Sequence, residues 1–290
     1  MADLSAATPA FRSFRQVEQR ERRAFWRRTA LWGIPFAMIV IVSGWMSEVN
    51  IEGLLGVPSG LWRYIDRTLP PVGLTTFRED MATWFWGFWR WADMLFQTML
   101  MGWLATILGV ALALPLSFVG ARNLTFSPTV YFLTRRLFEI WRAVPEIVYA
   151  LIFVFAFGLG PLAGILAIAV HSAGALGKLY SEVCENVDNA SLDGVRATGA
   201  GWAQTMAQAV FPQVLPMYLS YTLLRFEINV RSAAIIGFVG AGGIGQELFF
   251  VIRQFIFTDI SAIIIMLIVV VSAIDMVCEK LRHQVIGHAQ

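Results

Sequence analysis

Three long stretches of this sequence contain no Asp, Glu, Lys or Arg, and they constrain the fold more than any other feature. They cover residues 29–47, 94–121 and 147–177. A helix needs roughly 20 apolar residues to cross the hydrocarbon core of a bilayer, and each stretch supplies that length or nearly so. Only 14% of the 290 residues are charged, whereas soluble domains carry about 25%. The sequence therefore predicts an all-α integral membrane protein.

Turn signals divide the apolar part of the chain into six predicted transmembrane helices. The region 138–178 is too long for one crossing, because residues 147–177 alone would extend on the order of 45 Å as a helix, against roughly 30 Å of hydrocarbon. The sequence Gly-Leu-Gly-Pro at 158–161 is a strong turn signal, so this region is predicted to form a hairpin of two helices. The other four predicted helices cover about residues 30–47, 94–119, 213–238 and 257–280.

The distribution of basic residues predicts how these helices are oriented. Arginines crowd before the first helix, and the positive-inside rule places such a segment in the cytoplasm. With six helices the C-terminus is then cytoplasmic too, and the two cysteines, Cys184 and Cys278, fall on the cytoplasmic side, where a disulfide is not expected. The prediction divides the chain into a basic segment at 1–29, a first transmembrane helix at 30–47, an external segment at 48–93, a core at 94–281 and a cytoplasmic tail at 282–290.

The external segment ends in a stretch dense in tryptophan, TWFWGFWRWADML at 83–95. Tryptophan prefers the headgroup layer of a membrane. The stretch is therefore interpreted as an interfacial helix that leads into the second transmembrane helix. A docking surface for an external partner is the alternative.

A polar stretch at 191–216, SLDGVRATGAGWAQTMAQAVFPQVLP, is not apolar enough to cross a membrane. Its apolar residues recur at helical spacing, and the Gly-Ala-Gly sequence at 199–201 breaks the pattern. Two short helices with a sharp bend are predicted within residues 187–211. Such a pair could fit into a groove on another protein, or it could pack under its own bundle.

Several charged residues lie within the predicted transmembrane helices. Glu139, Arg142 and Glu146 have the spacing i, i+3, i+7, so they are predicted to share one helix face. A bare charge in the middle of a bilayer costs roughly 2.5–3.5 kcal/mol, so these groups are expected to face the interior. They either pair only to fix helix packing or line a water-filled path for an anion. The candidate pathway residues are Glu146, His171, Arg225, Glu227, Asn229, Arg231 and Ser232.

Two motifs that suggest nucleotide chemistry are interpreted otherwise. GAGGIG at 240–245 fits G-x-G-x-x-G but lies between two predicted membrane helices rather than in a βαβ unit. It is interpreted as a turn at an external gate, formed by Gly240, Gly242, Gly243 and Gly245. GALGKLY at 174–180 lacks the first glycine and the Ser/Thr of a P-loop, so no ATP site is expected on this chain. His171 is the one histidine in its predicted transmembrane helix, and no second His or Cys lies at metal-ligand spacing from it. No catalytic site is predicted either.

The sequences LALPLSFVGARN (112–123), FGLGPLAGILAIAVHSAGALGKLYSE (157–182) and RFEINVRSAAIIGFVGAGGIG (225–245) closely resemble the permeases of phosphonate and phosphite ABC importers. The resemblance extends over about residues 94–280 and includes the ATPase-coupling motif of such permeases. Asp193 stands where Glu is usual, and Gly194 and Val195 stand where Ala-Ala is usual. Gly199 matches the central glycine. The remaining residues assigned to coupling are Trp202, Phe211 and Pro212.

The resemblance implies a type I ABC importer fold and a location in the bacterial inner membrane. It also implies a homodimer, two cytoplasmic ATPase subunits that hold ATP and Mg²⁺, and an external substrate-binding protein. Under this interpretation the chain binds no cofactor and no nucleic acid. The alternative function is an ion-coupled secondary transporter or channel for a small anion. Such carriers often show internal repeats, and this sequence shows none.

Overall fold

The computed structural model describes residues 9–47, 51–71, 73 and 75–287, and every regular element among them is helical. The chain divides into two compact units, residues 1–66 and 67–290. Among the described residues, four helices are long and apolar enough to cross a membrane, and two bent helix pairs raise the number to six if each pair is one crossing. The helical class predicted from the sequence is confirmed.

The first unit contains the long helix α1 (Pro9–Met46) and most of α2 (Ile51–Thr68). The candidate membrane span within α1 is Arg20–Met46, which contains the predicted first transmembrane helix. The described part of the predicted basic segment and the predicted first transmembrane helix form one continuous helix, with no break after residue 29. Arginine is a good helix former, so the arginine-rich part continues as helix into the apolar part. Residues 1–8 of the predicted basic segment lie outside the described residues.

Three long helices form the centre of the second unit. They are α4 (Phe88–Val119), α7 (Pro161–Glu185) and α10 (Phe211–Ile236), with α12 (Phe257–Gly287) packed along α10. Small residues allow the close approach of α4 to the other two. A Cβ at Gly109 would lie 2.9 Å from the side chain of Ser172 on α7, and one at Gly102 would lie 3.0 Å from the backbone of Val230 on α10. Such contacts are typical of helix packing in membranes.

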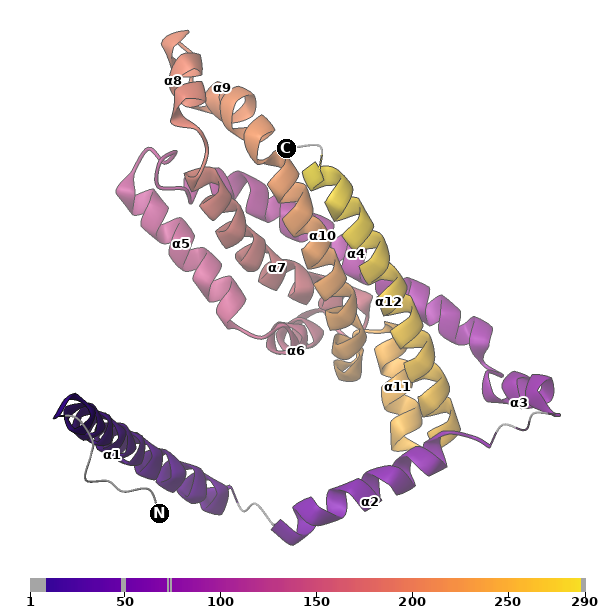
Figure 1. Ribbon diagram of the computed structural model, residues 1–290. Helices are drawn as coiled ribbons and strands as arrows, with labels where there is room; N and C mark the ends of the chain where they lie inside the picture. Colours follow the sequence, from indigo (N-terminus) through magenta and orange to yellow (C-terminus); the bar gives the residue numbers. More distant parts are fainter. Residues whose placement is uncertain (1–8, 48–50, 72, 74, 288–290) are drawn as a thin grey trace. The chain divides into compact units, whose positions relative to one another are not determined.

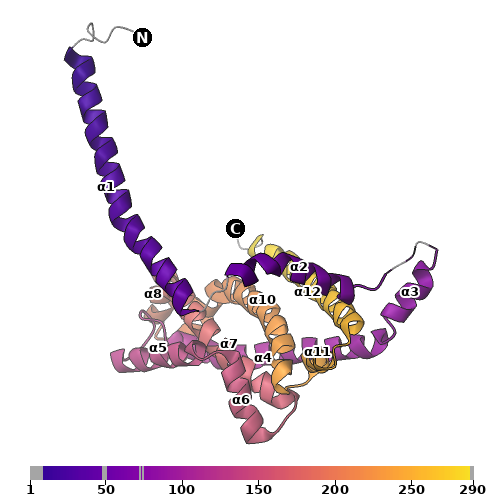
Figure 2. The same cartoon turned by 90° about the horizontal axis from the view of Figure 1, so that it is seen from below.

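The predicted third transmembrane helix is wrong as a single straight helix. The chain forms α5 (Pro128–Ala143) and α6 (Glu146–Phe157), which meet at 87° (Figure 2). Val144 has an extended conformation (φ −84°, ψ 124°) because the ring of Pro145 disfavours a helical conformation in the preceding residue. Glu146 is therefore not on a helix face shared with Glu139 and Arg142. The predicted break at 158–161 is confirmed, since α6 ends there and α7 begins.

The polar stretch forms two short helical elements on either side of the Gly-Ala-Gly sequence. They are α8 (Asn189–Ala197) and α9 (Trp202–Thr205), joined by a turn at Gly199, whose φ is +85°. Residues 189–205 are called the coupling segment below. The chain then continues as helix without interruption through Met206–Val210 into α10, so the predicted separation between the coupling helices and the fifth transmembrane helix is absent. Pro212 causes no break because it lies in the first turn of α10.

At the other end of α10 the chain turns through a glycine-rich segment into α11 (Gly243–Arg253), a helix that sequence analysis did not anticipate. Gly240, Gly242 and Gly243 all have positive φ, so the predicted turn is present. α10 is about 39 Å long. The coupling segment and α11 therefore lie at opposite ends of the second unit (Figure 1).

The tryptophan-rich stretch differs from its predicted form. It comprises the end of α3 (Phe77–Trp84), a short turn and the start of α4 at Phe88. Trp91 is fully buried, and the indole N–H groups of Trp84 and Trp86 donate hydrogen bonds to Ser261 Oγ (2.9 Å) and Asp259 Oδ1 (3.1 Å). Trp84 and Trp86 attach the end of α3 and the turn before α4 to the start of α12, whereas Trp89 is 84% exposed. Residues 48–50, 72 and 74 of the predicted external segment lie outside the described residues.

Candidate functional site

Four of the candidate pathway residues meet at the bend between α5 and α6. The carboxylate of Glu146, the first residue of α6, accepts a hydrogen bond from Ser232 Oγ at 3.2 Å. The same oxygen, Oε1, lies 3.5 Å from the guanidinium of Arg225 and 3.7 Å from Nε2 of His171. Glu146, His171, Arg225 and Ser232 are called the Glu146 cluster. It joins three helices, α6, α7 and α10, through one carboxylate.

The Glu146–Arg225 ion pair is largely buried, but both side chains keep some exposure to solvent. The side chain of Arg225 is 11% exposed and that of Glu146 is 25% exposed. Arg225 lies about 21 Å along α10 from Phe211, near the middle of that helix. A carboxylate at the N-terminal end of a helix is further favoured by the helix dipole. The cluster therefore places one guanidinium and one carboxylate inside the helix bundle, where they contact each other and remain partly accessible.

His171 connects this cluster to the bend itself. Its Nδ1 lies 3.1 Å from the carbonyl oxygen of Val144, which can only accept, so Nδ1–H donates this bond. This bond orients Nε2 toward Glu146. Because Val144 is the residue at which α5 ends, His171 on α7 holds the α5–α6 bend in position.

Asn229 lies next to the cluster but cannot contact a solute in this conformation. It is fully buried, its Oδ1 accepts a hydrogen bond from Ser172 (2.9 Å), and its Nδ2 donates one to Thr106 (2.9 Å). Ser172 in turn accepts a bond from Nε of Arg225 at 3.0 Å. Asn229 therefore supports Arg225 through Ser172.

Glu227 and Arg231 form a separate group on another face of α10. They pair with each other, and Arg231 also contacts Asp275 on α12 at 3.0 Å, while Arg282 contacts Glu227 at 3.6 Å. A helix advances about 100° per residue, so positions 225, 229 and 232 share one face, whereas 227 and 231 lie on another. The structure therefore divides the candidate pathway charges into two separate groups. This second group joins α10 to α12.

The coupling segment projects from the end of the bundle. Asp188 caps α8, and the hydrogen bonds it accepts from the backbone of Ala190 and from Ser191 lower the pKa of its carboxyl group. Leu192 faces inward and is buried, whereas Asp193 is largely exposed, and its one ion pair within the described part of the chain is with Arg196 at 3.7 Å. A Cβ at Gly194 or Gly199 would meet no neighbouring atom. The outer face of α8 is therefore free of packing against its own bundle.

Other residues of the predicted coupling motif contact the bundle. The indole N–H of Trp202 donates to the carbonyl of Leu124 at 2.8 Å, in the loop between α4 and α5. Val195 and Phe211 pack against the hydrophobic core beneath the coupling segment, and Pro212 is exposed at the start of α10. The motif thus divides into residues that anchor the coupling segment and residues that remain available to a partner.

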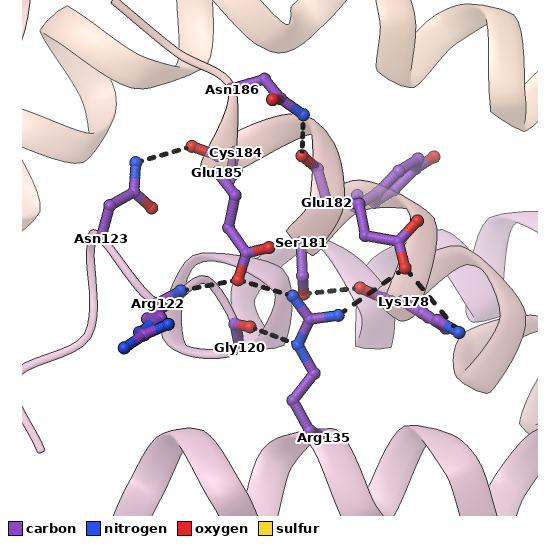
Figure 3. Close-up of polar contacts among 12 residues, drawn as sticks. Gly120, Arg122, Asn123, Arg135, Lys178, Ser181, Glu182, Cys184, Glu185 and Asn186 are labelled. Carbon is purple, nitrogen blue, oxygen red and sulfur yellow. Dashed lines mark hydrogen bonds and ion pairs between the residues drawn. The ribbon is translucent and has the colours of Figure 1, made fainter. Parts of the chain in front are cut away.

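A polar network that sequence analysis missed fixes the base of the coupling segment (Figure 3). Arg135 on α5 donates through Nε to the carbonyl of Gly120 at 2.8 Å and through its terminal nitrogen to Glu185 at 2.7 Å. Glu185 also accepts the backbone N–H of Arg122 at 2.9 Å. One guanidinium and one carboxylate therefore connect the middle of α5 to the C-terminal ends of α4 and α7.

The same network extends to neighbouring turns of α7. Glu182 lies 3.8 Å from both Arg135 and Lys178, and Asn123 donates to the carbonyl of Cys184 at 3.0 Å. Only three residues separate Glu185 from the start of α8. The pairing of residues fifty positions apart in sequence gave no local signal. Asp275 and Glu247, by contrast, are isolated charges within apolar helices and could have been noticed.

The predicted gate glycines lie where α7, α10 and α11 meet. A Cβ at Gly245 would lie 1.8 Å from the carbonyl oxygen of Ala234, so only glycine permits this contact between α11 and α10. The backbone N–H of Gly160 donates to the carbonyl of Gly240 at 3.0 Å, which joins the α6–α7 turn to the glycine turn.

This arrangement corresponds to a known family. The family described as "Binding-protein-dependent transport system inner membrane component" matches residues 105–281, a range that contains the Glu146 cluster and the coupling segment. The chain belongs to this family. It is an inner membrane component with several apolar helices, and the family assignment favours a binding-protein-dependent importer over the ion-coupled alternative.

Individual relatives of this inner membrane component cover different shares of it. "Phosphite transport system permease protein PtxC" from Stutzerimonas stutzeri is 34% identical over 272 residues, which are 92% of this chain and 94% of the relative. "Phosphate-import permease protein PhnE" from Mycolicibacterium smegmatis is 40% identical over 190 residues, which are 66% of this chain but only 36% of that protein. The chain thus spans about a third of the mycobacterial relative and nearly all of the phosphite relative.

The fold is that of solved ABC transporter subunits. A structure titled "Inward facing conformations of the MetNI methionine ABC transporter" superposes with a TM-score of 0.59 and 20% identity, over 68% of this chain and 97% of the solved one. The similarity places the inner membrane component in the type I importer fold.

The Glu146–Arg225 pair predicts a double-variant result. Breaking a fully buried pair costs about 3–5 kcal/mol. Because these side chains are partly exposed, we expect E146Q or R225Q alone to lower stability by about 2 kcal/mol. The E146Q/R225Q variant should recover most of that loss, measured by thermal unfolding in detergent. Uptake by the assembled transport system should stay low in all three variants. Normal uptake by the stable double variant would show that the pair is only structural.

The Arg135 network predicts a change in local dynamics. In R135Q, amide hydrogen exchange at residues 186–199 should become several-fold faster, because the base of the coupling segment loses the bonds that join α5 to Glu185 and Gly120. Arg136 is the matched control, because its one ion pair among the described residues is with Glu139 on the same helix. R136Q should leave this exchange unchanged. Equal protection in the two variants would contradict the assigned role of Arg135.

Proposed function

We propose that this chain is the membrane-spanning permease of an ATP-driven importer of a phosphorus oxyanion, namely phosphite, phosphate or a phosphonate. The observation that carries this proposal is the likeness over nearly full length to a phosphite transport permease. It is supported by a second relative named as a phosphate-import permease and by the motif resemblance described above. An anion requires a cationic group along its path, and the Glu146 cluster supplies one inside the bundle.

The permease crosses the membrane six times, with both ends of the chain in the cytoplasm. Four long helices and two bent pairs supply six crossings, and the arginines before the first apolar run favour a cytoplasmic N-terminus. In this orientation the coupling segment faces the cytoplasm and α11 faces the outside. The pathway then runs between the two ends of α10 and passes the Glu146 cluster near its middle.

Weak binding in this pathway follows from the pairing of Arg225. A free buried arginine would hold a dianion too tightly for transport, whereas an arginine already paired with Glu146 offers only part of its charge. A passing oxyanion can take the place of Glu146 beside Arg225, and Ser232 adds a neutral hydrogen-bond donor. His171 keeps the α5–α6 bend, and hence Glu146, in place during this exchange.

Transport requires partners that supply energy and substrate. Two copies of the chain form the dimer, and two ATPase subunits dock on the outer faces of the coupling segments, where Asp193, Gly194 and Gly199 remain exposed. ATP and Mg²⁺ bind to the ATPases, and this chain itself needs no cofactor. An external binding protein delivers the oxyanion to the α11 end. Nucleotide binding and binding-protein docking bias the membrane domain between its inward-open and outward-open states.

The proposal is tested with the complete transporter in proteoliposomes. Uptake of phosphite, phosphate and methylphosphonate should require ATP and the binding protein, and it should persist when ion gradients are collapsed. G199V should hydrolyse ATP without uptake, because valine is strained at a φ of +85° and distorts the coupling turn. G201A is the control, since Gly201 has a φ of −70° and a Cβ there would lie no closer than 3.9 Å to its nearest neighbour, Gln204 Oε1.

Two results would count against the proposal. Uptake driven by an ion gradient without ATP would indicate a different class of transporter. If the transporter takes up none of the three phosphorus compounds but transports another solute, the substrate assignment is wrong. The proposed coupling to ATP hydrolysis would be unaffected by that result.

A further inference from the structure

A cavity of about 630 Å³ opens at the end of α10 opposite the coupling segment. It is formed by the start of α4, the α6–α7 turn, the glycine turn and α11. Its volume falls in the range of about 300–1,000 Å³ that is usual for small-molecule sites. It is separate from the Glu146 cluster, because no residue of that cluster lines it.

The wall of this cavity is held rigidly. The Gly160–Gly240 backbone hydrogen bond joins the two turns at 3.0 Å. A Cβ at Gly240 would lie 2.3 Å from the side chain of Leu159, and one at Gly243 would lie 2.4 Å from Thr98 Oγ1. Gly240 and Gly243 also have positive φ, so the backbone conformation of the wall favours glycine at both positions.

The charged residues that line the cavity are two arginines and one glutamate, so their net charge is +1. Arg90 on α4 forms an ion pair with Glu247 on α11 at 2.8 Å, and Glu247 is only 9% exposed. This pair fixes the Arg90 guanidinium beside the cavity and leaves its other N–H groups available.

Arg253 is the second arginine, and it differs from Arg90. No carboxylate pairs with it among the described residues, and its guanidinium lies over the ring of Phe249 at 5.5 Å from the ring centre. The remaining lining is largely apolar, from Met94, Phe249 and Phe250, with the amide of Gln246 as a neutral donor. A cavity with two guanidinium groups and one apolar wall matches a tetrahedral oxyanion that carries an apolar substituent.

We propose that this cavity binds one phosphorus oxyanion group, with Arg253 and Arg90 as its cationic ligands. The group comes either from the transported anion on its way into the permease or from the headgroup of an anionic phospholipid at the membrane surface. The first source rests on the proposed function, and both share the same chemistry. In the first case the cavity is an entry site that the anion occupies before it reaches the Glu146 cluster.

The test measures how fast phenylglyoxal modifies individual arginines in the full-length permease, assembled with its ATPase in a detergent that contains no phosphate. Phosphite and short-chain phosphatidylglycerol are the two probes, and modification is followed residue by residue by mass spectrometry. Arg78 is an internal control in the same sample, because it is exposed and lies outside the cavity. We expect a probe to slow modification of Arg253 about tenfold and to leave that of Arg78 unchanged.

A charge-neutral variant tests the contribution of Arg90. R90Q alone would leave Glu247 buried without a partner, so R90Q/E247Q is the appropriate change. It should raise the probe concentration that gives half protection of Arg253 about tenfold.

Each outcome of the two probes has a distinct meaning. Protection by phosphite supports an entry site for the transported anion, and protection by phosphatidylglycerol alone supports a lipid-headgroup site. Protection by neither probe overturns the proposal. If phosphite protects Arg253 but the intact transporter takes up no phosphorus oxyanion, the cavity assignment stands and the proposed function fails. If the transporter takes up a phosphorus oxyanion but neither probe protects Arg253, the proposed function stands and the cavity assignment fails.

Discussion

The architecture of the second unit depends on one carboxylate placed at a helix bend. Glu146 contacts Arg225, Ser232 and His171 through the same oxygen, so α6, α7 and α10 are joined at a single point inside the bundle. Isolated charges are costly in such an environment, and the cost is reduced only while these partners stay together. Under the proposed function, a solute that competes with Glu146 for Arg225 would change the contacts of three helices at once.

Two further constraints act at the ends of the bundle. At the coupling end, Arg135 and Glu185 hold α4, α5 and α7 at the base of the coupling segment. At the other end, Gly245 lets α11 contact α10, and the glycine turn forms a cavity wall beside Arg90 and Arg253. Polar contacts therefore lie at the coupling end, at the Glu146 cluster and at the α11 end, and the small-residue packing of α4 against α7 and α10 connects them. Such a series of contacts is what a transporter needs if ATPase binding at the coupling end is to change the structure at the α11 end.

Sequence reasoning predicted the features that depend on local signals. The apolar runs and the glycine turn at 199 gave the helices and the coupling bend. The bend at Val144 was missed although the Pro145 signal was present, because the apolar run around it was interpreted as continuous helix. The Arg135–Glu185 contact left no such signal, since it joins residues that are far apart in sequence and meet only through tertiary packing.

Substituted-cysteine accessibility at Ser232 tests most directly whether the Glu146 cluster lines a hydrated path. S232C would be placed in a background in which the two buried native cysteines, Cys184 and Cys278, are replaced. The complete transporter is then treated with a charged methanethiosulfonate reagent, with and without ATP. If the cluster faces a path that opens alternately, S232C reacts from the aqueous phase and its rate changes several-fold with nucleotide. Absence of reaction in both states, in a transporter that remains active, would show that the cluster is sealed within the bundle.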